Sequence, residues 1–123
     1  MVYNTDNKIQ VGVYMRTVKD FYDYLDMIAP FSSQESWDNS GLLVGGFDRC
    51  VDKVAVVLDL NEETLEQAIF LETDLIITHH PVIFKAQKSF LDNSMAYRLA
   101  ENGISVIATH TPFDAASGGV NDI

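Results

Sequence analysis

The sequence predicts an α/β fold, a mostly parallel sheet with flanking helices, and three observations lead to that prediction. Short apolar runs at 53–60, 75–78 and 104–109 lack the polar alternation of half-exposed strands. Segments with helical spacing of apolar residues separate these runs. A strand–helix–strand–helix–strand order joins parallel strands through right-handed crossovers.

The first element is an amphipathic helix that begins after Thr17. Thr17 and Asp20 have the spacing of a capping box, with Asp in place of the usual Glu or Gln. Apolar residues then recur on one helical face, and Pro30 marks the end of the helix. Residues 1–16 show no helical or strand period, so we expect a leader or disordered segment before an α/β metal-binding domain at 17–123.

A short strand and the first long apolar run follow this helix. Glycines on both sides of residues 42–44 favour a short strand between tight turns. The run 53–60 is rich in β-branched residues and is typical of a strand buried on both faces. Asn61 then caps a second helix.

The remaining elements repeat this pattern. The strand at 75–78 is followed by a loop, after which Ser94 caps a third helix. Gly103 stands at the position where a glycine ends a helix, and the third strand spans 104–109.

Composition narrows the classes of function. The formal charge is −10, and the eight basic residues are scattered, which argues against nucleic-acid binding. No apolar run approaches the roughly 18–20 residues of a membrane-spanning helix, and no secretory signal is recognisable. Cys50 is the single cysteine, so we expect a protein without internal disulfides, located in the cytoplasm. The lack of a long apolar run adds the expectation that it does not bind membranes.

The candidate functional residues stand at the carboxyl ends of the predicted parallel strands. Asp59 ends the first strand, His79 and His80 follow the second, and His110 and Asp114 follow the third. In open parallel sheets, ligands bind beyond the carboxyl ends of the strands, where loops from neighbouring strands converge. All three histidines of the chain fall at this edge, which favours a divalent-metal site.

The adjacent pair His79–His80 needs a special geometry to bind metal. Side chains of neighbouring residues in a regular strand face opposite sides, so the pair does not normally hold one ion. Pro81 restricts His80 to an extended conformation, and at the strand end each imidazole can hold a different ion with Asp114 between them. The alternative is a solvated strand end or a capping interaction.

Ordinary structural roles compete at the other positions. His110 either bonds backbone carbonyls or faces the substrate, and Asp114 is either a metal ligand or a cap of the next turn. Asp59 before a helix is more often a cap. Residues 38–39 are turn residues by default, and a role at the edge where the strands end is the alternative. The chain has no G-x-S-x-G, Walker A or G-x-G-x-x-G motif.

Four motifs stand in an order and spacing that resemble a known family. They are WDNSGLLVG at 37–45, THHPVIF at 78–84, HTPFD at 110–114 and GGVND at 118–122. From about residue 17 to its end, the chain resembles the Nif-three-like family, also labelled GTP cyclohydrolase I type 2 homologues.

This resemblance implies a hexameric ring in which each subunit holds a dinuclear metal centre. Imidazole and carboxylate donors suit divalent zinc, iron or manganese. His79 and His80 match the family's ligands, one for each ion, Asp114 matches the bridging ligand, and His110 matches a histidine lining the site. Family members are about twice as long and complete the site with a His-x-x-x-Glu motif near the C-terminus. We therefore expect an N-terminal portion of the family fold with an under-occupied metal site.

The leading functional hypothesis is a divalent-metal-binding protein with a dinuclear, hydrolase-like site. Two ions about 3.5–4 Å apart activate water, and His110 acts as general acid or base. The alternatives are a non-catalytic metal-binding oligomeric scaffold or regulatory protein, and a folded fragment without a function of its own.

Overall fold

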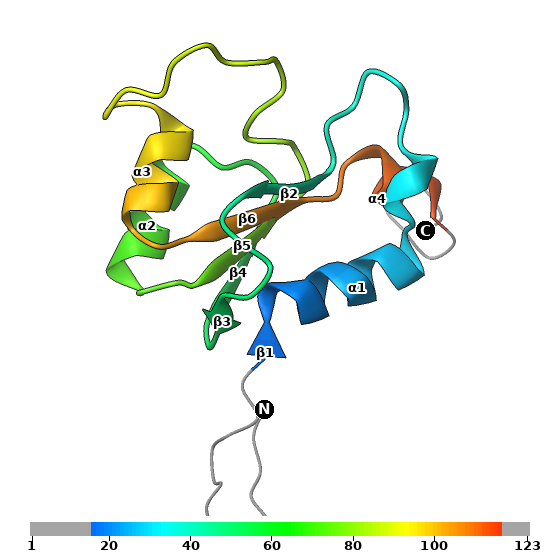
Figure 1. Cartoon of the computed structure of the whole chain (residues 1–123), viewed down its shortest axis with the longest axis horizontal. Coiled ribbons are helices and arrows are strands. Elements are labelled where there is room, and N and C mark those ends of the chain that lie inside the picture. The colour runs from blue at the N-terminus through cyan, green and yellow to red at the C-terminus, as the bar shows by residue number, and fades with distance from the viewer. Residues whose placement is uncertain (1–15, 117–123) are drawn as a thin grey trace, which may run out of the picture.

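Residues 16–116 are described by the structure, a computed structural model of the chain (Figure 1). The expected leader at 1–16 lies outside this range except for Arg16, which begins strand β1 (Arg16–Thr17). The GGVND motif at 118–122 also lies outside the described residues. No helix within 16–116 is long and apolar enough to cross a membrane.

The central sheet has four strands in the order β2-β6-β5-β4. Strands β4 (Val54–Val57), β5 (Leu75–Thr78) and β6 (Ser105–Ala108) are parallel. Strand β2 (Gly41–Val44) pairs antiparallel with β6. The predicted α/β fold with a mostly parallel sheet is confirmed.

Helices cover both faces of this sheet (Figure 1). Helices α2 (Glu62–Phe70) and α3 (Met95–Glu101) pack on one face, where Ile76 and Val106 point toward them. Helix α1 (Val18–Ile28) packs on the other face. Successive side chains of β5 and β6 thus divide between two apolar clusters, as the pleat of a strand requires.

Local capping signals explain where the helices begin. Thr17 and Asp20 form both bonds of a capping box at α1. Asn61 does the same with Thr64 at α2, and Ser94 caps α3. Gly103 follows α3 with a φ of +70°, a conformation that favours glycine.

Three short elements complete the fold around these layers. Strand β3 (Cys50–Val51) pairs with β1 in a separate two-stranded sheet. The 3₁₀ turn η1 (Phe31–Ser33) follows α1, and helix α4 (Thr111–Ala115) follows β6.

Strand β4 differs from the prediction for 53–60, which was a strand buried on both faces. It occupies the edge of the sheet, and its side chains alternate between exposed and half-buried. Val56 is 75% exposed and Leu58, just beyond the strand, is 62% exposed. The apolar run does form a strand, but burial depends on strand order, and β5 and β6 occupy the centre of the sheet.

Candidate metal centre

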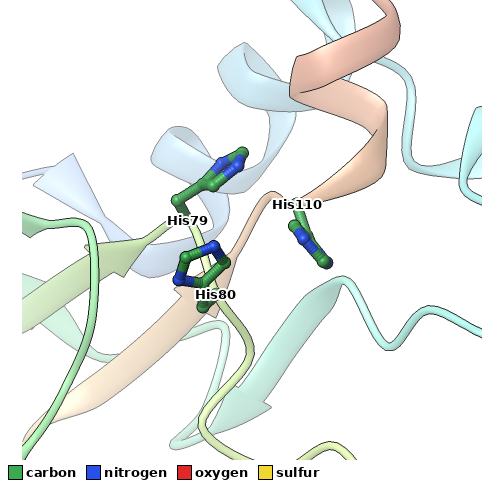
Figure 2. Close-up of side chains that lie close together, drawn as sticks. All are labelled: His79, His80 and His110. Atoms are coloured by element: carbon green, nitrogen blue, oxygen red, sulfur yellow. The ribbon is translucent and has the colours of Figure 1, made fainter. Parts of the chain in front are cut away.

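The histidines come together because β5 and β6 are parallel neighbours. His79 and His80 follow β5, and His110 follows β6 (Figure 2). The backbone N–H groups of His79 and His80 donate to the carbonyl oxygens of Val57 and Leu58, each at 3.1 Å. The ladder between β4 and β5 therefore continues through the histidine pair and holds its backbone.

The three imidazole rings form a nearly equilateral triangle. Their centroids are 5.0 Å apart for His79 and His80, 5.1 Å for His79 and His110, and 5.2 Å for His80 and His110. One nitrogen from each ring lies within 4.8 Å of the others. The adjacent pair therefore approaches a common point, which a regular strand would not permit.

Each imidazole Nδ1 atom faces an oxygen atom that only accepts hydrogen bonds. The pairs are His79 with the carbonyl of Thr109 (3.1 Å), His80 with Asp59 (2.5 Å) and His110 with Asp38 (3.2 Å). In a neutral ring, this partner places the proton on Nδ1 and leaves the lone pair on Nε2. Metal-binding histidines commonly have this arrangement, since an acceptor behind the ring orients it.

Asp114 lies beside His79 at the start of α4. Its Oδ1 atom is 3.3 Å from Nε2 of His79, a nitrogen that bears a lone pair when the ring is neutral. Two electron-rich atoms at this distance repel unless a proton or a cation lies between them. Ligands 2.0–2.2 Å from a tetrahedral ion are about 3.3–3.6 Å apart, so this pair fits a shared metal ion.

Asp38, for which the sequence favours a turn over a role at the edge of the sheet, lies against the cluster. Its side chain is fully buried behind His110. Burial alone would raise the pKa of this carboxyl, but hydrogen bonds from the hydroxyl and N–H of Thr111, the hydroxyl of Ser40 and the N–H of Asn39 lower the pKa to about 2. A carboxylate anion therefore stands behind one ring of the cluster.

Strand pairing explains why the sequence does not predict the contact between Asp38 and His110. Gly41 of β2 pairs with Ala108 of β6 in antiparallel register. Residues just before β2 therefore lie beside residues just after β6, and Asp38 meets His110 across the sheet edge. The motif at 37–45 was the available signal, but its contact with 110–114 depends on a pairing that local patterns do not reveal.

Asp59 has a role other than the helix cap favoured by the sequence. The cap of α2 is Asn61, while the Asp59 carboxylate contacts Nδ1 of His80 at 2.5 Å. Both side chains of this pair are about half-exposed. Asp59 thus supports the cluster from the solvent side, whereas Asp38 supports it from the interior.

Aromatic and apolar groups border the cluster. Trp37 lies edge-on to His110 with ring centroids 5.7 Å apart, and it also contacts Phe84 at 6.3 Å. A cavity of about 420 Å³ opens beside His79 and is lined mostly by apolar side chains. They include Leu25, Val56, Leu58, Ile77 and Phe113.

The structure brings all four predicted site residues to one region. His79, His80 and His110 are the group within the described residues whose spacing suits a metal ion, and Asp114 contacts His79. His110, expected to face the substrate, is also placed to be a ligand. Metal ligation by His79, His80 and Asp114 stays a prediction, as does a catalytic role for His110.

Comparisons with known proteins give a consistent result. A family model described as Duf34/NIF3 (NGG1p interacting factor 3) matches residues 16–123. A protein named GTP cyclohydrolase 1 type 2 homolog from Campylobacter jejuni is 40% identical over 101 residues, which are 79% of this chain and 41% of that protein. A protein of the same name from Clostridium perfringens is 32% identical over 109 residues, 85% of this chain and 42% of that protein.

Solved structures agree with these relatives. A hypothetical protein of Staphylococcus aureus matches with a TM-score of 0.82 and 39% identity, covering 87% of this chain and 37% of that one. A Bacillus cereus protein related to NIF3 matches with a TM-score of 0.81 and 31% identity, covering 88% and 31%. The chain thus spans less than half the length of the relatives it matches.

Proposed function

The chain belongs to the Duf34/NIF3 family, and on that premise we propose that it binds divalent metal ions through His79, His80 and Asp114 in a hydrolase-like centre. The contact between Nε2 of His79 and Oδ1 of Asp114, 3.3 Å long, is the observation that carries the proposal. The Nδ1 proton of a neutral His79 ring is directed to a carbonyl oxygen, which leaves the lone pair on Nε2. A cation between Nε2 of His79 and Oδ1 of Asp114 therefore relieves the repulsion between those two atoms.

The donor set suits two ions of zinc, iron or manganese. Imidazole nitrogens favour zinc and iron, and a carboxylate oxygen also admits manganese. In the proposal, His79 and His80 each serve one ion and Asp114 bridges them. Support comes from the rings of His79 and His80, which lie 5.0 Å apart and are tilted by 53°, so that each can serve its own ion.

His110 is the proposed general acid or base. Its Nδ1 atom is committed to Asp38, so its Nε2 atom is the one that can take a proton from a nucleophile and return it to a leaving group. Bound divalent ions would supply Lewis acidity and lower the pKa of water. Both His79 and His110 are largely shielded from solvent, which limits competition by bulk water.

Metal content is the measurement that tests the site. The wild-type chain, purified without chelator, is expected to carry near-stoichiometric metal by elemental mass spectrometry. His79→Ala and Asp114→Ala are expected to lose most of it, because each removes a donor from the same ion. Asp92→Ala removes an exposed carboxylate away from the cluster and serves as the matched control. A metal-free wild type, or equal content in all four proteins, would contradict the proposal.

Hydrolysis distinguishes an enzyme from a metal-binding scaffold. We propose phosphoryl or amide-like substrates, to be assayed with zinc, manganese or iron in parallel with metal-free samples. Turnover that requires metal and is lost in His110→Gln would support the hydrolase. Stoichiometric metal without turnover in any substrate class would favour the non-catalytic scaffold.

We also propose that the whole protein acts in the cytoplasm as a homohexameric ring. The family motifs support this assembly, and the exposed apolar side chains of Val56 and Leu58 offer contact surface at the sheet edge. Sedimentation analysis of the whole protein gives its oligomeric state directly. A monomer at micromolar concentration would contradict the proposed ring.

A further inference from the structure

We infer that Asp38 is a positioning residue that sets which nitrogen of His110 carries the proton. Its carboxylate holds His110 in the tautomer with hydrogen on Nδ1, so that Nε2 keeps a lone pair for a metal ion or a substrate proton. The inference rests on the proposed function, because it names Asp38 as the residue that keeps Nε2 of His110 available to that site.

The two oxygen atoms of Asp38 have separate partners. Oδ2 accepts from the hydroxyl of Thr111 (2.5 Å), the N–H of Thr111 (3.0 Å) and the hydroxyl of Ser40 (2.8 Å). Oδ1 accepts from the N–H of Asn39 (2.7 Å) and faces Nδ1 of His110 (3.2 Å). The carboxylate cannot rotate without losing several of these bonds, so Oδ1 stays an acceptor toward the ring.

The segment around Asp38 holds the backbone of His110 as well as its ring. The N–H of His110 donates to the hydroxyl of Ser40 at 3.0 Å, and that hydroxyl in turn donates to Asp38. The Asp59–His80 pair differs, because the Asp59 side chain is 57% exposed and water can replace it. The Asp38 side chain, by contrast, is fully buried.

Asp38→Asn changes the hydrogen-bonding character of one atom while keeping the shape of the side chain. Three donors surround Oδ2, whereas Oδ1 accepts from one backbone donor, the N–H of Asn39. The carbonyl oxygen of the amide is therefore expected at the Oδ2 position, which gives up the bond from Asn39 and leaves the amide NH₂ facing His110. An NH₂ group donates, so Nδ1 must become the acceptor and the ring proton moves to Nε2. A ring with hydrogen on Nε2 has no lone pair there, and an aspartate-to-asparagine change behind a catalytic histidine acts in this way in serine proteases.

Nitrogen NMR of the full chain, labelled with ¹⁵N-histidine, measures the tautomer directly. The chain has three histidines, so single His→Gln variants assign every imidazole signal. In chelator-treated wild type at pH 8, His110 is expected to carry its proton on Nδ1. In Asp38→Asn the proton is expected on Nε2. Thr111→Val is the matched control, since it removes a donor to Oδ2 but leaves Oδ1 facing the ring.

Three results would overturn the inference. One is a wild-type His110 that carries its proton on Nε2, which is independent of whether Asp38→Asn folds. Another is a tautomer that changes in Thr111→Val as much as in Asp38→Asn. The third is an Asp38→Asn variant in which the proton stays on Nδ1. Metal binding gives a separate answer: if the tautomer switches but wild type binds no zinc, the proposed function fails and the positioning role stands. If zinc binds but the tautomer does not switch, only the positioning role fails.

Discussion

Nε2 of His79 and Oδ1 of Asp114 lie 3.3 Å apart, although one residue follows β5 and the other lies in α4. The Nδ1 atom of the same ring faces the carbonyl oxygen of Thr109 at 3.1 Å. The ring is therefore held between a backbone acceptor and a carboxylate, and a cation bound between His79 and Asp114 would link two elements of the fold.

Metal binding is expected to stabilise the folded chain. An ion at 100 times its dissociation constant adds about 2.7 kcal/mol to the free energy of unfolding. For a folded unit of this size, that raises the Tm by roughly 10 °C or more. Calorimetry of chelator-treated protein with and without zinc measures the shift. His79→Ala should show little of it, and an equal shift in that variant would place the ion elsewhere.

Acid should destabilise the protein through Asp38. The pKa of this carboxyl is about 2 in the folded chain, below its ordinary value of 3.8, so folding favours the charged form. Its contribution of about 2 kcal/mol is fully present above about pH 4 and is lost as pH falls toward 2. Urea unfolding of metal-free protein at several pH values measures the loss. Asp38→Asn should show a smaller loss over this range, and an identical pH profile would rule out this role.

A side chain at Gly45 is expected to destabilise the fold. Its φ is +106°, and a Cβ there would overlap the side chain of Ser105 and lie 2.9 Å from its Cα atom. Gly45→Ala is expected to lower the free energy of unfolding by about 2–5 kcal/mol. Gly46→Ala is the control, because a Cβ at Gly46 meets only the Arg49 side chain at 3.7 Å. Similar denaturation midpoints for the two variants would refute the expectation.

The edge position of β4 predicts unequal effects for the same substitution. Val56 is 75% exposed, whereas Val106 in the central strand β6 is completely buried. Val106→Ala is expected to cost roughly 1–3 kcal/mol, because it leaves a cavity, and Val56→Ala about 0.5 kcal/mol or less. Urea denaturation of both variants compares the two sites. A large loss for Val56→Ala would show that another surface covers it in solution.

Local signals in the sequence were sufficient for most of the fold. Thr17, Asn61 and Ser94 are caps because their side chains can bond the free N–H groups of the next turn, a property that depends on a few neighbouring residues. The apolar runs predicted the parallel strands, and parallel order in turn predicted that His79 and His110 meet at one edge.

Tertiary structure decided the features that depend on which strands are neighbours. The order β2-β6-β5-β4 leaves Val56 at the edge, although its sequence neighbourhood is as apolar as that of a central strand. The antiparallel pairing of β2 with β6 brings Asp38 to His110 from 72 positions away. Residue type and spacing determine the local conformation and identify the strand ends at which the candidate site residues stand. The partner behind each histidine is set by long-range pairing, because a hydrogen bond depends on distance in space and not along the chain.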